Sequence, residues 1–402
     1  MSYADIVKEA NKYSSVLTDI RRDLHQIPEF GLQLPKTLER VLASVHGLGE
    51  ITLSKTITSA VLHIKGAQPG PTVLLRADMD ALAVVEDTGL DFASTNGYMH
   101  ACGHDGHTAM LLAAAQHLAT QGEFDGTLNL IFQPAEEGGG GALKMMEDGL
   151  FERFPCDAIF AMHNMPGMPQ GQLVFRSGPT MASSDYATVT LHGHGGHGAM
   201  PHKATDVVVA AASLIMALQT VVSRHVDPMQ PAVVTVGAVH AGEANNVIPA
   251  EARLEISVRA LDPQVRRSME QRIRELVMLQ AQSHGVRAEL DWRPGYAVLV
   301  NDAQQTARAL AVAQRHFPAQ QINPQGPMLT GSEDFAFMLE RVPGSYLFIG
   351  NGADGEPGAC MVHNPAYDFN DLNIAPGAAY WIALVQDLLS PTPESNPKET
   401  TP

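Results

Sequence analysis

The sequence predicts an α/β protein made of two domains, one of which is inserted into the other. Strand-like apolar runs alternate with helical stretches between residues 72 and 164, which is the pattern of a mostly parallel sheet. Over residues 186–293 the order changes to β-α-β-β-α-β, which is typical of a ferredoxin-like module. The α/β pattern then resumes, so we expect the chain to return to its first domain.

Turn residues bound the elements of the first domain. An amphipathic helix is expected to end before Pro28, and a later helix, 141–149, is expected to begin after the run of glycines. Two apolar segments near the end, "DFAFMLE" and "SYLFIG", are expected to complete this domain. The predicted helices are 4–26, 105–120, 141–149 and 302–315, and the predicted strands are 72–80, 127–137 and 156–164.

The inserted module has its own strands and helices. Its predicted strands are 186–192, 232–239, 251–259 and 286–293, and its predicted helices are 204–223 and 263–284. The expected domains are therefore 1–184 together with 296–390, and 185–295. The remaining residues, 391–402, are polar and proline-rich, and we expect a disordered tail there.

Composition excludes several classes of function. The chain of 402 residues has a formal net charge of −17, so neither a nucleic acid nor an acidic membrane surface is an expected partner. Its three cysteines do not form the even set of a disulfide framework. The N-terminus lacks the apolar stretch of a signal peptide. The longest apolar run, 207–218, is expected to be too short to span a bilayer. We therefore expect a cytoplasmic protein.

Potential metal ligands follow each apolar run of the first domain. Asp78 and Asp80 follow one run, Glu136 and Glu137 follow the next, and His163 lies in the third. Because ligand sites of open α/β sheets form at the carboxyl ends of strands, these side chains are expected at one edge.

The stretch "MHACGHDGHTAMLL", residues 99–112, adds a thiol and imidazoles to this edge. Imidazole, thiolate and carboxylate all suit borderline divalent metals. The candidate ligands are Cys102, His104, Glu137, His163 and His363. This number suffices for two ions if a thiolate or a water bridges them. Either Asp78 or Asp80 is expected to orient a ligating imidazole.

Each of these residues also has a structural interpretation. A lone cysteine is usually a small buried hydrophobe, and a lone histidine is usually a hydrogen-bonded core residue. Glu136 and Glu137 could form a solvated acidic pair, but an apolar run precedes them and four glycines follow. Since adjacent carboxylates point in different directions, one can ligate while the other acts as a base. His100 and His107 are not expected to be ligands, and His107 is expected to have a supporting role.

Motifs of competing chemistries are absent from the sequence. It contains no G-x-S-x-G, no H-E-x-x-H, no phosphate-binding G-x-x-x-x-G-K-[ST] and no P-C-x-x-C of zinc deaminases. The histidine-rich "HGHGGHG" at 192–198 lacks the lysine of a phosphate loop.

The combination of motifs resembles one family, the dinuclear metallopeptidases that include aminoacylases, hippurate hydrolases and indoleacetyl-amino-acid hydrolases. The similarity runs from "RRDLHQIPEFG" to "HNPAYDFND" through "PAEEGGGGA", "AMHNMP", "GHGGHGAMPH", "NVIP" and "GSEDF". Two positions depart from the usual pattern, Ala83 after "DMDAL" and Leu34-Pro35 after "PEFG".

The resemblance implies a metal-dependent amidohydrolase of N-acyl amino acids. Cys102 would bridge two divalent ions, with His104 and His163 on one and Glu137 and His363 on the other. Glu136 would be the general base toward a water between the ions. The ions would be manganese or zinc, with cobalt and nickel as alternatives.

The resemblance also assigns roles to the inserted module, as a lid and as the contact of a homodimer or homotetramer. His197 would reach the scissile carbonyl, often from the partner subunit in this family. The implied substrate-binding residues are Asn246, Arg259, Gly331, Ser332 and Glu333. The planar fork of an arginine suits a substrate carboxylate. The alternative for Arg259 is a surface pair with Asp262.

Two other functions stay open at this point. One is a dipeptidase or exopeptidase that uses the same metal centre. The other is a metal-binding or peptide-binding homologue without turnover, against which the presence of Glu136 argues.

Overall fold

A large mixed sheet organises the first part of the chain in the computed structural model, which describes residues 3–390. Its strand order is β1-β2-β4-β3-β5-β16-β6-β15. The central strands β4, β3, β5 and β16 are parallel, while β1 and β2 run antiparallel at one edge. The bounds are β1 Glu50–Leu53, β2 Ala60–Lys65, β3 Thr72–Asp78, β4 Thr127–Gln133, β5 Ala158–Pro166, β6 Leu173–Val174, β15 Ile322–Asn323 and β16 Gly344–Gly352.

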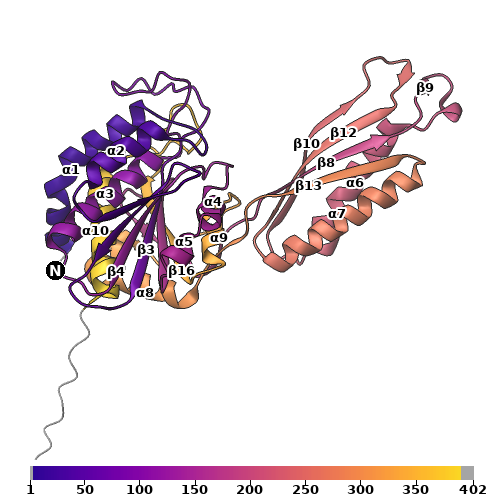
Figure 1. Cartoon of the computed structure of the whole chain (residues 1–402). Coiled ribbons are helices and arrows are strands. Elements are labelled where there is room, and N and C mark those ends of the chain that lie inside the picture. Colours follow the sequence, from indigo (N-terminus) through magenta and orange to yellow (C-terminus); the bar gives the residue numbers. More distant parts are fainter. Residues whose placement is uncertain (1–2, 391–402) are drawn as a thin grey trace, which may run out of the picture. The chain divides into compact units, whose positions relative to one another are not determined.

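Helices cover this sheet (Figure 1). Helices α1, α3 and α10 pack against one another, and α3 is buried along most of its length, because its middle turns, residues 109–115, are apolar on all sides. The bounds are α1 Tyr3–Gln26, α2 Pro35–Val45, α3 His104–Gln121, α4 Gly141–Glu147, α5 Leu150–Arg153, α8 Ala303–His316, α10 Ile374–Leu388, η2 Ala319–Gln321 and η3 Asp371–Asn373.

The first turn of α3 packs so closely that one position requires glycine. A Cβ atom at Gly106 would lie 2.4 Å from Cδ2 of Phe369, whose side chain is fully buried. Gly106→Ala is therefore expected to lower the free energy of unfolding by about 1–3 kcal/mol through overpacking, although alanine favours helices. Chemical denaturation measures the change. Gly237→Ala is the control, since no atom of residues 3–390 beyond its two chain neighbours lies within 4 Å of the added Cβ. An equal loss in both variants would contradict the packing argument.

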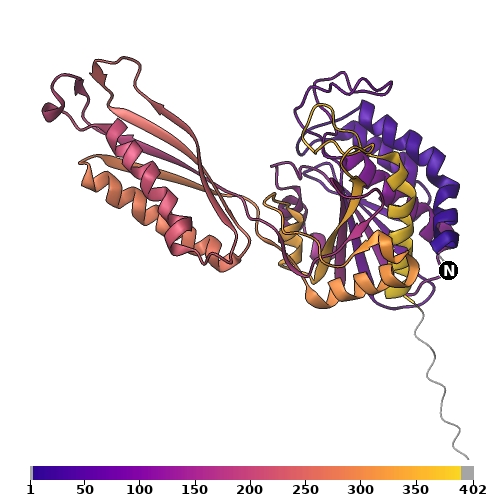
Figure 2. The ribbon, with the colours of Figure 1, turned by 180° about the vertical axis from the view of Figure 1, so that it is seen from behind.

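The second unit is a four-stranded antiparallel sheet with two helices on one face (Figure 2). Its strand order, β10-β12-β8-β13, and its β-α-β-β-α-β sequence confirm the predicted ferredoxin-like module. The carboxylates of Asp206 and Asp262 cap the two helices by accepting backbone N–H bonds. The bounds are β8 Asp185–His192, α6 Val207–His225, β10 Ala232–Ala241, β12 Glu251–Ala260, α7 Pro263–Ser283 and β13 Arg287–Pro294, with short elements β9 Gly196–His197, η1 Pro201–Lys203 and β11 Val247–Ile248.

Packing divides the chain into two units. The first contains the residues up to Gly178, Asn301–Gly326 and the residues from Met338 on; the second contains Pro179–Val300 and Pro327–Phe337. The segments where the chain passes between the units contain β7 Gly178–Met181, β14 Leu299–Asn301 and α9 Phe335–Leu339. Residues 391–402, for which disorder is predicted, lie outside the described residues.

Helix α6 corrects one expectation from the sequence. It is 19 residues long and, by length and composition alone, apolar enough to cross a membrane. The apolar run 207–218, which we expected to be too short to span a bilayer, is part of this longer helix, which continues to His225. One face of α6 packs on the strands of its own module, so its apolar character also suits a core helix.

Candidate metal centre

Four groups of side chains in the described part of the first unit offer ligand atoms close together, and two of these groups share Cys102. Cys102, His104 and His163 form one group, and Cys102, Glu137 and His363 form the other, with the ligand atoms of each within 4.8 Å of one another. The sulfur of Cys102 belongs to both groups and lies 3.3 Å from Nε2 of His163. Nε2 of His363 lies 3.2 Å from Oε1 of Glu137. The geometry therefore offers two neighbouring sites that share one sulfur.

The segment that carries Cys102 and His104 turns sharply into α3. Gly103 has a φ of 83°, and a Cβ atom there would lie 2.3 Å from the Tyr367 hydroxyl and 2.5 Å from Nδ2 of Asn164. Only glycine fits this left-handed conformation and this close approach. The turn places the thiol just before the helix and the imidazole on its first residue.

A second turn presents the two glutamates. Strand β4 ends at Gln133 rather than continuing to residue 137 as predicted, because Pro134 lacks an N–H group and Ala135 has a φ of 54°. The Asp80 carboxylate accepts the N–H bonds of Glu136 at 2.9 Å and Glu137 at 3.0 Å. The same carboxylate lies 3.4 Å from Nδ1 of His104. Asp80 thus holds this turn beside a candidate ligand.

Asp78 supports the site through His107 rather than through a candidate ligand. Its Oδ1 lies 2.6 Å from Nδ1 of His107, whereas His104 is 3.9 Å away. Arg76 donates to its other oxygen at 2.6 Å. The supporting role expected for His107 thus corresponds to a buried contact with Asp78.

Asn164 and Tyr367 are structural parts of the site that the sequence interpretation did not single out. The N–H group of Asn164 donates to Nε2 of His107 at 2.9 Å, and its side-chain amide donates to the carbonyl of Cys102 at 2.7 Å. The Tyr367 hydroxyl donates to Oδ1 of Asn164 at 2.8 Å. Both could have been noticed from their place in the sequence, because Asn164 directly follows His163 and Tyr367 lies in the motif that contains His363.

His363 lies on a loop, not on a strand or helix. Its φ is 67°, and within residues 3–390 only His363 and Ala135 combine a side chain other than hydrogen with a positive φ. Its backbone N–H donates to the carbonyl of Ala101 at 2.7 Å. Left-handed conformations of such residues are costly and gather at functional sites.

The charges of the site fit divalent cations. Neither ring nitrogen of His104 makes a hydrogen bond to any residue from 3 to 390, although the side chain is buried. Burial opposes protonation of His104, but the carboxylates of Asp78 and Asp80 outweigh burial and raise its pKa to about 10. Burial and the neighbouring Glu137 and Glu136 carboxylates raise the pKa of the Cys102 thiol well above its usual value. The carboxylates of the site thus favour positive charge, and thiol, imidazole and carboxylate ligands converge on it, a set that suits divalent ions.

The second unit holds the predicted substrate-binding residues in two separate places. Arg259 near the end of β12 donates to the Ser332 hydroxyl at 3.1 Å and to the Tyr186 hydroxyl at 3.3 Å. Gly331 and Glu333 belong to the same segment as Ser332, and the Gly331 carbonyl accepts the N–H of Ala182 at 2.9 Å. The alternative partner of Arg259, Asp262, instead caps α7.

His197 and Asn246 lie at the other end of this module. His197 is in β9, which pairs with β11, and the carbonyl of Asn246 accepts the N–H of Gly198 at 2.8 Å. Both side chains are exposed. His197 and Asn246 therefore lie at the end of the module's sheet where β12 begins, at which Glu251 of β12 pairs with His192 of β8 (Figure 1). The eight-residue distance from Glu251 to Arg259 spans roughly 27 Å in an extended strand.

Comparison with known proteins identifies the family. The model of peptidase family M20/M25/M40 matches residues 74–387, which contain both ligand groups. The chain belongs to this family.

Relatives of this M20 protein share its length and act on amides. It is 41% identical over 367 residues to the hippurate hydrolase of Campylobacter jejuni, covering 91% of this chain and 94% of that protein. It is 37% identical over 382 residues to an N-acetyl-L-cysteine deacetylase of Bacillus subtilis, covering 94% and 89%. The chain is accordingly a hydrolase of amide bonds.

A solved structure agrees with the fold and the metal content. The dinuclear metal-binding M20 peptidase of Bacillus subtilis superimposes with a TM-score of 0.82 at 32% identity, covering 94% of this chain and 99% of that chain. This M20 protein therefore has the fold of a dinuclear metal-binding enzyme, and its two ligand groups sharing one sulfur suit two divalent ions.

Proposed function

We propose that this M20 enzyme hydrolyses N-acyl amino acids to a carboxylic acid and a free amino acid. The observation that carries the proposal is the pair of ligand groups that share the Cys102 sulfur, with the Glu136 carboxylate beside them. Glu136 is a member of neither Cys102 group, but one of its oxygens lies within 4.8 Å of the ligand atoms of His104 and Glu137.

The residues of the chain divide the work of amide hydrolysis. Bound divalent ions supply Lewis acidity, which polarises the amide carbonyl and lowers the pKa of water. Glu136 takes the proton of the attacking water and delivers it to the leaving nitrogen as the carbon–nitrogen bond breaks. Asp80 holds the backbone of Glu136 and Glu137, so the base and its neighbouring ligand keep a fixed separation.

Arg259 is the proposed anchor of the amino-acid carboxylate. Its guanidinium is partly buried and is held by two neutral hydroxyl groups, those of Ser332 and Tyr186. Neither of these two bonds neutralises the charge of the guanidinium, so a substrate carboxylate would gain a charge-assisted, bidentate partner. Gly331, Ser332 and Glu333 are proposed to line the same subsite.

A second copy of the chain is proposed to supply His197, which would stabilise the oxyanion with Asn246 beside it. The amide carbonyl and the carboxylate of an N-acyl amino acid lie only a few bonds apart. Arg259 and the His197 end of the module are separated by the length of β12, so one chain cannot place both side chains on one substrate. We propose a homodimer, or a homotetramer of such dimers, through the inserted module.

The edge of the module's sheet offers a surface for this contact. Strand β10 pairs only with β12 in the sheet order of the described residues, and its outer side chains are largely exposed. On α6, Val208, Val209 and Met216 are also exposed. An open strand edge beside apolar side chains suits pairing with an identical chain.

Subunit mixing tests the origin of His197. His197→Ala and Glu136→Gln chains are each expected to be nearly inactive, whereas exchange in an equal mixture should restore about a quarter of wild-type activity, since half the dimers are mixed and each has one complete site. Turnover of a benzoyl amino acid before and after exchange measures this. The control is the same mixture of His197→Ala and Glu136→Gln chains measured before subunits have exchanged. If activity does not recover after exchange has been demonstrated, His197 acts in the site of its own chain.

A substrate panel tests the proposed reaction. Metal-stripped enzyme is given manganese, zinc, cobalt or nickel and then acetyl- or benzoyl-amino acids, or dipeptides with a free amino group. We expect manganese or zinc to restore turnover of the acylated substrates above that of the dipeptides. Faster dipeptide hydrolysis would favour an exopeptidase.

The free thiols Cys102, Cys156 and Cys360 suit the reducing cytoplasm, where we propose the enzyme acts.

A further inference from the structure

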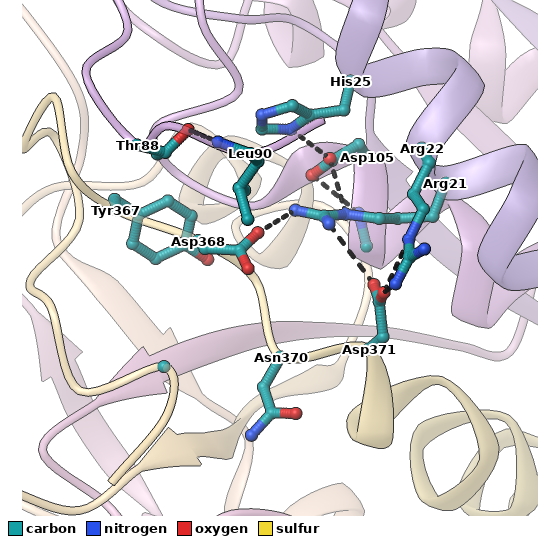
Figure 3. A network of polar contacts seen from close by, with 12 residues as sticks. Arg21, Arg22, His25, Thr88, Leu90, Asp105, Tyr367, Asp368, Asn370 and Asp371 are labelled. Carbon is teal, nitrogen blue, oxygen red and sulfur yellow. Dashed lines mark hydrogen bonds and ion pairs between the residues drawn. The ribbon is translucent and has the colours of Figure 1, made fainter. Parts of the chain in front are cut away.

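A buried arginine far from the ligands in sequence connects the two segments that carry them. The Arg21 side chain of α1 is fully buried, and its Nε lies 2.9 Å from Oδ2 of Asp105. The same guanidinium lies 2.7 Å from Oδ1 of Asp368 and 3.3 Å from Oδ1 of Asp371. Figure 3 shows these three carboxylates around one guanidinium.

The acidic partners of Arg21 stand next to candidate metal ligands. Asp105 directly follows His104 at the start of α3, whereas Asp368 lies on the loop after His363 and Asp371 is the first residue of η3, to which that loop leads. Arg21 therefore contacts both the helix that presents His104 and the segment that presents His363.

Other groups reinforce the Asp105 side of this junction. Nδ1 of His25 lies 2.8 Å from the same Oδ2 of Asp105, and its Nε2 lies 3.2 Å from Oε1 of Glu86. The Arg21 guanidinium also stands 5.7 Å from the ring centre of Phe369, the residue that contacts Gly106. The junction thus combines charge and packing around the first turn of α3.

Burying an arginine among carboxylates is a poor way to gain stability, because desolvation offsets much of the attraction. Such a group does fix geometry, since a guanidinium offers donors in a rigid planar arrangement. Here the fixed geometry is the separation of the two ligand-bearing segments.

We propose that Arg21 is a positioning residue for the dinuclear centre, which sets the His363 loop against the start of α3 so that both ligand groups can share Cys102. This inference rests on the two-ion assignment of the proposed function. Arg21 touches neither the ions nor the substrate; it acts through Asp105, Asp368 and Asp371.

The two ligand groups are expected to depend on Arg21 unequally. The His104 side chain is fully buried and lies beside Asp80, whereas the His363 side chain is 54% exposed on its loop. When the guanidinium is lost, His363 is the ligand that can move. The ion held by Glu137 and His363 should therefore be lost first.

Cobalt titration of the metal-stripped full-length enzyme tests the proposal, with visible absorption and equilibrium dialysis as readouts. Arg21→Met is expected to keep one tightly bound ion and to weaken the second by about 10- to 100-fold, the range found for outer-shell partners. kcat should fall with little change in KM and should recover at high cobalt concentration. Arg21→Lys should restore part of the affinity.

Arg22→Met is the matched control. Arg22 directly follows Arg21 on α1, pairs with the same Asp371 at 2.9 Å and has a side chain that is 46% exposed, but among the described residues no ion pair joins it to Asp105. The Arg22→Met enzyme should bind two ions as the wild type does. Asp368→Asn removes one acidic partner at a partly exposed position and serves as a second test if Arg21→Met does not fold; it should weaken the same ion.

The outcomes separate this inference from the proposed function. If the wild type binds fewer than two cobalt ions, the two-ion assignment fails. If the wild type binds two and Arg21→Met and Asp368→Asn bind two equally tightly, whatever their melting temperatures, Arg21 does not position the centre and the inference is overturned.

Discussion

Replacing Glu136 with glutamine is expected to lower kcat by about 10²- to 10⁴-fold, the usual contribution of a general base, while two metal ions remain bound. Glutamine has nearly the same shape as glutamate but cannot accept a proton from water at neutral pH. Glu136 is buried and belongs to neither ligand group that contains Cys102. The backbone N–H that Asp80 holds is unchanged by the substitution, so the turn should keep its conformation.

Two measurements check this prediction together, the steady-state kinetics with a benzoyl amino acid and the number of ions bound per chain. Glu147→Gln, at an exposed side chain on α4, is the control and should leave both values unchanged. Loss of an ion from Glu136→Gln in proportion to activity would show that Glu136 is a ligand and not the base.

Replacing Cys102 with alanine is expected to have an effect of similar size on metal binding. The Cys102 sulfur is the one ligand atom common to both groups, so its removal weakens both sites at once. We expect the second ion to bind more than about 100-fold more weakly, beyond the effect of an outer-shell change, and turnover to fall with it. Titration of the metal-stripped variant with zinc measures the affinity.

Cys102→Asp is the informative companion variant. A carboxylate can bridge two ions as a thiolate can, and aspartate is close to cysteine in reach, so this variant should recover binding of the second ion better than Cys102→Ala. Unchanged binding of two ions by Cys102→Ala would mean that the sulfur is only a packed side chain, as for most buried cysteines.

Periodicity and turn residues sufficed to predict the main architecture. The strands that became β3, β4 and β5 are mostly apolar and buried at nearly every position, whereas burial alternates along β8 of the module, as expected for a sheet buried on both faces and one buried on a single face. Helix α2, the edge strands β1 and β2, and α10 were not predicted. β1 is only four residues long, and its pairing with β2 is a tertiary property that no local pattern reveals.

The candidate ligands were accessible from sequence because they lie in short, recognisable motifs: Glu137 and His163 near strand ends, Cys102 and His104 at the start of α3, and His363 on a loop. His163 lies inside β5, three residues before its end at Pro166. The support around the ligands was less accessible. Arg21 is 84 residues from Asp105 and 347 residues from Asp368 along the chain. Asn164 contacts the Cys102 segment only by donating to the backbone carbonyl of Cys102, a contact that depends on no particular side chain there. Contacts over such separations depend on the fold, not on spacing.

The inserted module shows the same limit for function. The sequence motifs named His197, Asn246, Arg259 and Ser332 without fixing which of them act in the same chain, and the module places the first two and the last two at opposite ends. This separation supports the proposal, implied by the family resemblance, that a second copy of the chain supplies His197. The motifs indicate which residue types take part in the reaction, but the position of each residue along its strand determines which of them can contact the same small molecule.

A crystal structure of the zinc-loaded enzyme, with anomalous diffraction measured on both sides of the zinc edge, tests the central claim most directly. The account predicts two zinc peaks about 3.5–4 Å apart, with the Cys102 sulfur between them, His104 and His163 on one and Glu137 and His363 on the other. A single peak, or two peaks with the Cys102 sulfur turned away into the apolar core, would contradict it.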